Sequence, residues 1–241
     1  MRVHILPFGI LKDWLGRSTL ELPDGATVGA LLDRLAMQRE GIPAGTWSSI
    51  AVSVNHEYAG AGQVLREGDE VGLLPPVSGG ADEAGGESGR TALVREAIDA
   101  VPLLAAAKHG SDGAVVAFDG IVRDNTRGRK TLHLDYEAYE EMALKQMREL
   151  AAQARERFGV RHVTIVHRLG RLLVGETSVL IVVASAHRSH AYEASRWLID
   201  TLKKTVPIWK KETFVDGVVW ADGEPFPENI AIRPLEKSHG A

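Results

Sequence analysis

The residues best suited to chemistry lie between positions 187 and 212, around a helical pattern that a proline ends. This stretch holds six Lys or Arg, three acids and two His, and the candidates among them are His187, Arg188, Lys203, Lys210, Lys211 and Glu212. The first two stand at the start of the pattern, where unpaired backbone amides and the helix dipole also favour an anion. The start of the helix is therefore expected to supply half of an anion-binding site. The lysines could supply the rest, although lysines in a last helical turn or on an edge strand are often only solvated.

The element that positions these residues is an amphipathic helix from Ala191 to about Thr205. Apolar or small residues recur along it at spacings of three and four. Ser189 is suited to cap its start. Pro207 limits its end, because proline lacks an amide hydrogen and disfavours helical angles in the residue before it. At about 1.5 Å per residue, the two ends of the helix lie on the order of 20 Å apart.

Composition narrows the class of protein. The chain has 241 residues, 44% hydrophobic and 25% charged, with a net charge of −4 and no cysteine. That length favours two domains, and the balance is typical of a globular protein that binds neither nucleic acid nor membrane. No apolar run approaches the roughly 20 residues that span a bilayer, and no signal peptide is evident, so we expect a cytoplasmic protein. Without cysteine, any sulfur that the chain handles must be carried by another group.

Residues 1–80 have the pattern of a small ubiquitin-like domain. Two strands, a helix capped by Thr27, and two further strands are expected in turn. The domain ends in LLPPVSGG, so that Gly79 and Gly80 form a slender tail. Residues 81–90, ADEAGGESGR, have the composition of a flexible linker. The double glycine is therefore open to two interpretations, a functional tail or the start of the linker.

Residues 91–241 predict an α+β domain with mixed strands. An apolar strand at 113–122 leads into Arg123 and a polar loop with further cations. A charged helix is expected at 140–158, followed by strands and then the helix of residues 191–205. The remaining histidines sit in strand-like segments without the paired spacing of metal ligands, so we expect no metal site and no cofactor.

The order of these motifs is similar to that of a known enzyme family. His-Arg-Ser, a helix, Leu-Lys and then Pro-x-Trp-Lys-Lys-Glu resemble the signature of the large, catalytic subunit of molybdopterin synthase, and Arg123 falls at its substrate-binding arginine. Residues 1–80 resemble the small, sulfur-carrying subunit. The resemblance covers almost the whole chain. It implies an α+β fold with an N-terminal ubiquitin-like β-grasp domain joined by a Gly-rich linker to an α/β-hammerhead-like catalytic domain.

The resemblance also implies an activity in molybdenum cofactor biosynthesis. The family inserts two sulfurs into cyclic pyranopterin monophosphate to form the dithiolene of molybdopterin. The sulfur arrives as a thiocarboxylate on the carrier's last glycine, here Gly80, after loading by an adenylating and sulfurating enzyme. Lys203 and Lys210 are the implied catalytic residues, with Lys203 the first choice for general acid or base or for stabilising an oxyanion. The substrate-binding candidates are Arg123, His187, Arg188, Lys203, Lys210, Lys211 and Glu212.

Two further expectations concern assembly. A small pterin cannot easily touch both ends of the helix, so we expect a homodimer through the catalytic domain in which the two lysines of one chain meet His187 and Arg188 of the other. Carrier subunits end at Gly-Gly, whereas Gly80 is here joined to Ala81. An amide carbonyl cannot be adenylated as a free carboxylate can. We therefore expect a protease to cut after Gly80 before activity.

Two other functions remain open on the sequence alone. A non-enzymatic ubiquitin-like adaptor tethered to a phosphate-binding module would use the same cations only for docking. An enzyme of nucleotide or phosphate-ester metabolism would also need cations, but the chain lacks a glycine-rich phosphate loop of the required spacing and an acidic metal cluster. The order of the motifs favours molybdopterin synthase over both.

Overall fold

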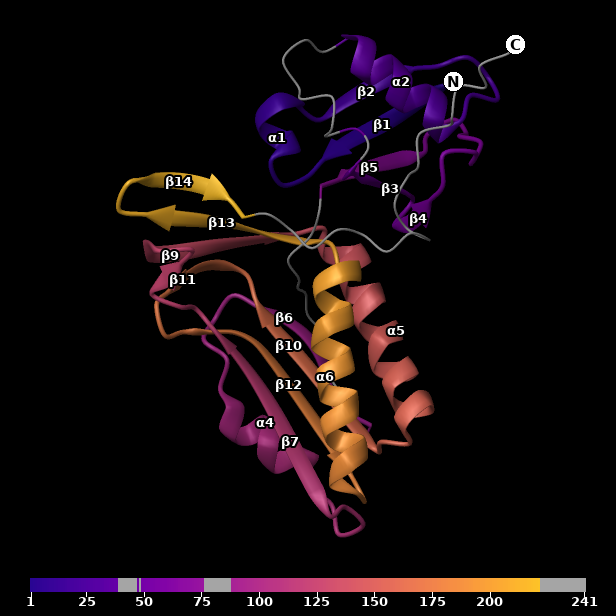
Figure 1. The fold of residues 1–241 in the computed structure, drawn as a ribbon. Coiled ribbons are helices and arrows are strands. Elements are labelled where there is room, and N and C mark those ends of the chain that lie inside the picture. Colours follow the sequence, from indigo (N-terminus) through magenta and orange to yellow (C-terminus); the bar gives the residue numbers. More distant parts are fainter. Residues whose placement is uncertain (39–46, 48, 76–87, 222–241) are drawn as a thin grey trace, which may run out of the picture. The chain divides into compact units, whose positions relative to one another are not determined.

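The computed structural model describes residues 1–38, 47, 49–75 and 88–221. These residues form two compact units, one within Met1–Pro76 and the other within Val77–Gly223 (Figure 1). Each unit has its own hydrophobic core. The tail residue Gly80 and most of 81–90 lie outside the described residues. No helix in the described part of the chain is long and apolar enough to cross a membrane.

The first unit is a five-stranded sheet with one long helix. Its elements are β1 (Arg2–Pro7), α1 (Leu11–Trp14), β2 (Ser18–Glu21), α2 (Val28–Gln38), β3 (Ala51–Val54), β4 (Glu57–Ala59) and β5 (Glu70–Leu74). In space the strands follow the order β2-β1-β5-β3-β4, and β1 runs parallel to β5. Because the first and last strands pair at the centre of the sheet, the unit has the expected β-grasp arrangement.

The helix of the first unit starts where the sequence predicts. Thr27 Oγ1 accepts a hydrogen bond from the amide of Ala30 at 3.3 Å, which satisfies one free donor of the first turn. Val28 and Leu31 are fully buried against the sheet. The short elements α1 and β4 were not predicted, because four and three residues are too few to show a period.

The second unit contains two sheets and three helices in the described residues. Its elements are β6 (Thr91–Val94), α4 (Ala100–Ala107), β7 (Ala114–Ile121), β8 (Asn125–Thr126), β9 (Arg129–Ala138), α5 (Glu140–Phe158), β10 (His162–Arg168), β11 (Gly170–Leu173), β12 (Thr177–Ser185), α6 (Arg188–Thr205), β13 (Ile208–Phe214) and β14 (Gly217–Trp220). One sheet has the order β6-β10-β12-β7. The other has the order β11-β9-β13-β14, with β8 paired to β9. This confirms the expected α+β class.

Helices cover both faces of the β6-β10-β12-β7 sheet (Figure 1). Successive side chains of β12 point to opposite faces, as in any strand. Ile181 therefore packs toward α5 and α6, whereas its neighbour Leu180 packs toward α4. Both are almost fully buried. Burial on two faces explains why β12 reads as an uninterrupted apolar run in the sequence.

The chain docks onto the second unit from Ser88 onward. Ser88 O accepts a hydrogen bond from the amide of Val163 at 3.1 Å, and Arg90 O accepts one from Ile165 at 2.7 Å. Between them Gly89 has φ +119°, and an added Cβ would lie 1.8 Å from the carbonyl oxygen of Val163. Only glycine fits this close approach of two backbones.

The start of α6 differs from the prediction. The helix begins at Arg188, and His187 is its N-cap with an extended backbone, so Ser189 lies inside the first turn. The predicted cap was wrong by two residues. The reason is that β12 continues to Ser185, which leaves only two residues to turn the chain into the helix.

Candidate active site

A cavity of about 340 Å³ opens beside β13 and β14 in the second unit. Its charged and aromatic lining includes Arg123, Arg127, Arg129, Lys210, Glu212 and Phe214. We call this set the cationic pocket. Three of the residues predicted from the sequence, Arg123, Lys210 and Glu212, come together here from β13 and from the loop after β7.

Lys210 is held in the pocket by a buried acid. Lys210 and Glu212 are two residues apart on β13 and therefore share one face of the sheet. The Lys210 Nζ lies 3.1 Å from Glu212 Oε1, and the two side chains are 28% and 4% exposed. Separating such charges in a poorly hydrated site would be costly, so the carboxylate keeps the ammonium in place. The second oxygen, Glu212 Oε2, is buried without a hydrogen-bond partner among the described residues.

Arginines also line the cavity. Arg129 Nη2 lies 2.8 Å from Asp216 Oδ1, and its guanidinium carbon lies 3.9 Å from the centre of the Phe214 ring. The hydrogen bond from Arg129 holds the pKa of the exposed Asp216 carboxyl below its ordinary value. Arg123 is exposed and forms no ion pair with any described residue. Arg129 is therefore a fixed cation, whereas Arg123 can turn to an incoming anion.

The side chain beside Lys210 on the neighbouring strand and the ring that contacts it are uncharged at neutral pH. Tyr136 is the cross-strand neighbour of Lys210 on β9. Burial raises the pKa of the Tyr136 phenol, and the nearby charge of Glu212 raises it further against a hydrogen bond with Ser178. The His167 ring lies edge-on to Tyr136, with centroids 5.0 Å apart. Burial lowers the pKa of His167 to about 4, so the imidazole is neutral.

The other predicted residues lie outside the cationic pocket. Lys203 is exposed in the last turn of α6. Lys211 follows Lys210 on β13, so its side chain points to the opposite face of the strand. Its Nζ lies 5.3 Å from the centre of the ring of Trp220, a residue that also lines the cavity. His187 and Arg188 are exposed at the start of α6, and the 15 residues of helix from Arg188 to Lys203 separate them by about 23 Å along the axis.

Sequence reasoning missed three members of this site, Arg129, Phe214 and Tyr136. Arg129 was seen as one cation of a polar loop, but its stacking on Phe214 requires the pairing of β9 with β13, which lie far apart in the sequence. Alternation along residues 132–138 was the one available signal for Tyr136. In the described residues, no three potential metal ligands gather into a binding site.

Comparison with known proteins accounts for both units. A family model described as MoaE protein matches residues 93–205, and a model of the ThiS family matches residues 5–80. The molybdopterin synthase catalytic subunit of Pyrococcus abyssi is 44% identical over 121 residues, which make up 50% of this chain and 82% of that protein. The chain belongs to the molybdopterin synthase catalytic subunit family. The match to the ThiS family adds a sulfur-carrier domain to the same chain, as the resemblance implied.

Two further relatives agree with this assignment. The catalytic subunit of Halalkalibacterium halodurans is 41% identical over 133 residues, 55% of this chain and 85% of that protein. The crystal structure of molybdopterin synthase from Staphylococcus aureus matches with a TM-score of 0.51 and 41% identity, covering 54% of this chain and 94% of that one. This likeness covers about half of the chain.

Proposed function

We propose that the chain is a molybdopterin synthase with its sulfur carrier fused to its catalytic unit. It transfers sulfur from a thiocarboxylate on Gly80 to cyclic pyranopterin monophosphate. The observation that carries the proposal is the cationic pocket, in which buried Glu212 holds Lys210 and which Arg123 and two more arginines also line. A chain whose residues 5–80 match a sulfur-carrier family supplies the other reactant.

The pocket suits a phosphorylated substrate. A guanidinium can bond two phosphate oxygens at once, and Arg123 forms no competing ion pair with the described residues. Arg129 is already anchored by Asp216 and Phe214, so it adds a fixed positive charge at little further cost in entropy. This arrangement favours a substrate orientation in which the phosphate contacts the arginines and the reacting carbons lie toward Lys210.

The chemistry needs a positive charge near the carrier's last carbonyl. The thiocarboxylate sulfur forms a bond to a substrate carbon while a carbon–oxygen bond at that carbon breaks, and the oxygen leaves with the opened phosphate or as water. The product is a thioester with Gly80. Water then attacks the thioester carbon, an oxyanion develops, and its collapse breaks the carbon–sulfur bond, leaving sulfur on the substrate and a carboxylate on Gly80. Lys210, and Lys203 as acid or base, would stabilise that oxyanion and move its protons. Each sulfur transfer uses one loaded tail, so two loaded tails are needed to make one dithiolene.

The decisive assay supplies the full chain with an adenylating enzyme, a sulfur source and the cyclic pterin. We expect a dithiolene product whose formation requires Lys210. A non-enzymatic adaptor is the rival function, and it predicts that Lys210→Ala changes ligand binding while no pterin is transformed by either protein. Substrate bound but never converted by the loaded, correctly folded chain would therefore refute the proposal.

The carrier tail also requires a free end. Gly80 is joined to Ala81, and an amide carbonyl cannot be adenylated and exchanged for sulfur, so we propose that the bond is cut, by a protease or another route. Intact-protein mass spectrometry reads both events, because a fragment ending at Gly80 becomes heavier when one oxygen is replaced by sulfur. An uncut chain that accepts sulfur and makes product would contradict the requirement for cleavage and leave the enzyme assignment intact.

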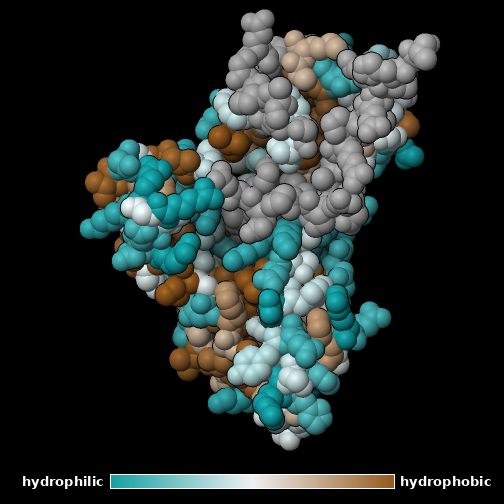
Figure 2. All heavy atoms as spheres, in the orientation of Figure 1, coloured by the Kyte–Doolittle hydropathy of each residue, from teal (hydrophilic) through white to brown (hydrophobic). Residues whose placement is uncertain are grey.

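We further propose that two chains share each active site. The structure extends α6 over 18 residues, so the cations at its start and the lysine near its end cannot contact one small pterin in the same chain. Exposed apolar side chains lie on both faces and at the turns of the sheet of the cationic pocket, where Figure 2 shows brown patches among hydrophilic residues. They include Leu132, Leu173, Val174, Val215, Val218 and Val219. Such a surface suits a second copy of the catalytic unit.

Mixing two impaired variants tests the shared site. An Arg188→Ala chain and a Lys203→Ala chain are each expected to show little activity alone when the substrate concentration is well below KM. In a mixed dimer one site keeps both intact halves, so activity should return to about a quarter of the wild-type value when half of the dimers are mixed. No recovery, despite exchange of subunits shown by native mass spectrometry, would rule out sharing.

A further inference from the structure

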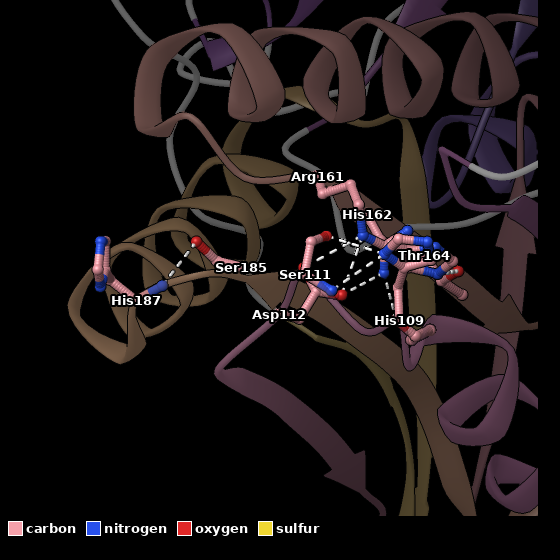
Figure 3. A network of polar contacts seen from close by, with 9 residues as sticks. His109, Ser111, Asp112, Arg161, His162, Thr164, Ser185 and His187 are labelled. Atoms are coloured by element: carbon pink, nitrogen blue, oxygen red, sulfur yellow. Dashed lines mark hydrogen bonds and ion pairs between the residues drawn. The ribbon is translucent and has the colours of Figure 1, made fainter.

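An ion pair between Arg161 and the buried carboxylate of Asp112 supports the turn that leads into α6 (Figure 3). Asp112, in the loop between α4 and β7, accepts hydrogen bonds from the Arg161 Nε at 3.1 and 2.9 Å and also from its Nη2. The Asp112 side chain is only 4% exposed. Arg161 Nη2 also donates to the carbonyl oxygen of Ala107 at 2.6 Å, which ties the end of α4 to the same guanidinium.

Backbone hydrogen bonds connect the residues of this ion pair to the end of β12. The amide of Arg161 donates to Ala184 O at 3.0 Å, and the amide of Gly113, next to Asp112, donates to Ser185 O at 3.1 Å. Gly113 also lies so close that an added Cβ would be 2.5 Å from the carbonyl oxygen of Ala186. The last residues of β12 and the turn after it are therefore gripped on one side by residue 161 and on the other by residue 113.

The gripped turn sets the direction of the first residues of α6. Ser185 is 1% exposed, and its Oγ accepts a hydrogen bond from the His187 amide at 3.4 Å. His187 then caps the helix with an extended backbone, and Arg188 follows as its first residue. Both of their side chains are exposed, and only the backbone before them is held. A shift of this turn would move both cations together.

We propose that Asp112, Arg161 and Gly113 are positioning residues for the His187 and Arg188 side chains. They fix the turn, and hence the direction in which these cations meet the substrate phosphate. The inference rests on the proposed function, because it assumes that these two cations bind substrate. A buried ion pair is weak evidence for stability, since apolar replacements are often as stable, but this pair joins three segments that share one turn.

The test uses Asp112→Asn, which keeps the size of the side chain and removes its charge. We expect turnover at low substrate concentration to fall about 10-fold to 100-fold, because misplacing binding groups by about 1 Å has effects of that order. The matched control is Asp200→Asn, which removes an acid from an exposed pair with Arg196 on α6. The control should change turnover by about twofold or less.

Complementation then separates positioning from general damage. If the ion pair acts through the start of α6, an Asp112→Asn chain should regain activity when mixed with a Lys210→Ala chain, since one site of the mixed dimer is then complete. It should regain none with an Arg188→Ala chain, because both variants damage the same half of the site. When the control pair Lys210→Ala with Arg188→Ala recovers activity, recovery of Asp112→Asn with both partners, or with neither, overturns the inference. A misfolded Asp112→Asn chain that cannot exchange counts as recovery with neither.

One control pair and one further measurement distinguish this result from a failure of the shared site. The pair Lys210→Ala with Arg188→Ala must itself show recovery; if it does not, sharing has failed. The inference is then tested on enzymes made of one kind of chain, without mixing. Asp112→Asn and Gly113→Ala should each raise KM, as Arg188→Ala does. Neither change should raise KM further when Arg188→Ala is already present. Additive increases in KM would overturn it.

Discussion

The two ends of α6 present cations in opposite ways. Beyond its last turn, Lys210 is paired with a buried carboxylate and faces a wall in which Arg129 stacks on Phe214. At its first turn, His187 and Arg188 stand in solvent, and only the backbone behind them is fixed. The first arrangement resembles a preorganised reaction site, and the second a surface that is completed by something else.

The difference has a physical basis. Strand side chains on one sheet face lie side by side, so a sheet can surround a cation with acids, rings and other cations. A helix start offers backbone donors and an outward direction, but few neighbouring side chains. We therefore expect changes in the cationic pocket to affect the chemical step and changes at the helix start to affect substrate binding.

The largest effect is expected for the two proposed catalytic lysines. Lys210→Ala and Lys203→Ala should each lower kcat by about 100-fold to 1,000-fold, the usual cost of removing a group that stabilises an oxyanion. Lys204→Ala is the matched control, because Lys204 shares the last turn of α6 and is also exposed. Equal effects at 203 and 204 would show that Lys203 only offsets the helix dipole. Single-turnover kinetics with a loaded carrier measures the step.

The lowered pKa of the buried His167 predicts that the free energy of unfolding depends on pH. Burial lowers the pKa of His167 to about 4, whereas an unfolded histidine titrates near 6.5. Between these values the unfolded chain binds a proton that the folded chain does not, so the free energy of unfolding falls as pH falls from 6.5 to 4. The loss is at most about 3 kcal/mol. His167→Gln should flatten this slope in urea unfolding at pH 4 to 7; an unchanged slope would assign it to other groups.

The buried acid gives a smaller effect on stability with a clear effect on activity. Glu212→Gln keeps the shape but removes the charge that holds Lys210, and we expect a loss of about 1–3 kcal/mol in unfolding free energy. Turnover should fall while binding of inorganic phosphate changes little, because Arg123 and Arg129 remain. A variant with reduced stability but full turnover would show that Glu212 serves the fold alone.

The smallest effect is expected for Lys211→Ala. Lys211 was a substrate-binding candidate by sequence, and it points to the opposite face of β13 from Lys210, over Trp220. We expect KM and kcat to stay within about twofold of the parent chain. A loss comparable to that of Lys210→Ala would mean that the incoming carrier tail uses both faces of the strand.

Much of the fold was predictable because its long elements have clear periods. The expected helix at 140–158 coincides with α5, and the apolar run within β12 was identified as a buried strand. Short elements such as β11 and β14 were missed, since four residues cannot display a period above noise. The cap of α6 was misplaced because both Ser189 and His187 are compatible with a helix start, and only the length of β12 decides between them.

The sequence by itself determined the chemistry that is available: a double-glycine tail, no cysteine, and cations in an order that identified the family. Those properties depend on residue types and order, which folding does not change. Only the tertiary structure decided that Arg123, Lys210 and Glu212 share one pocket, that Lys211 faces away, and that a buried ion pair braces the start of α6. These facts depend on strand pairing between segments distant in the chain, and pairing is set by the burial of whole faces, which no local pattern records.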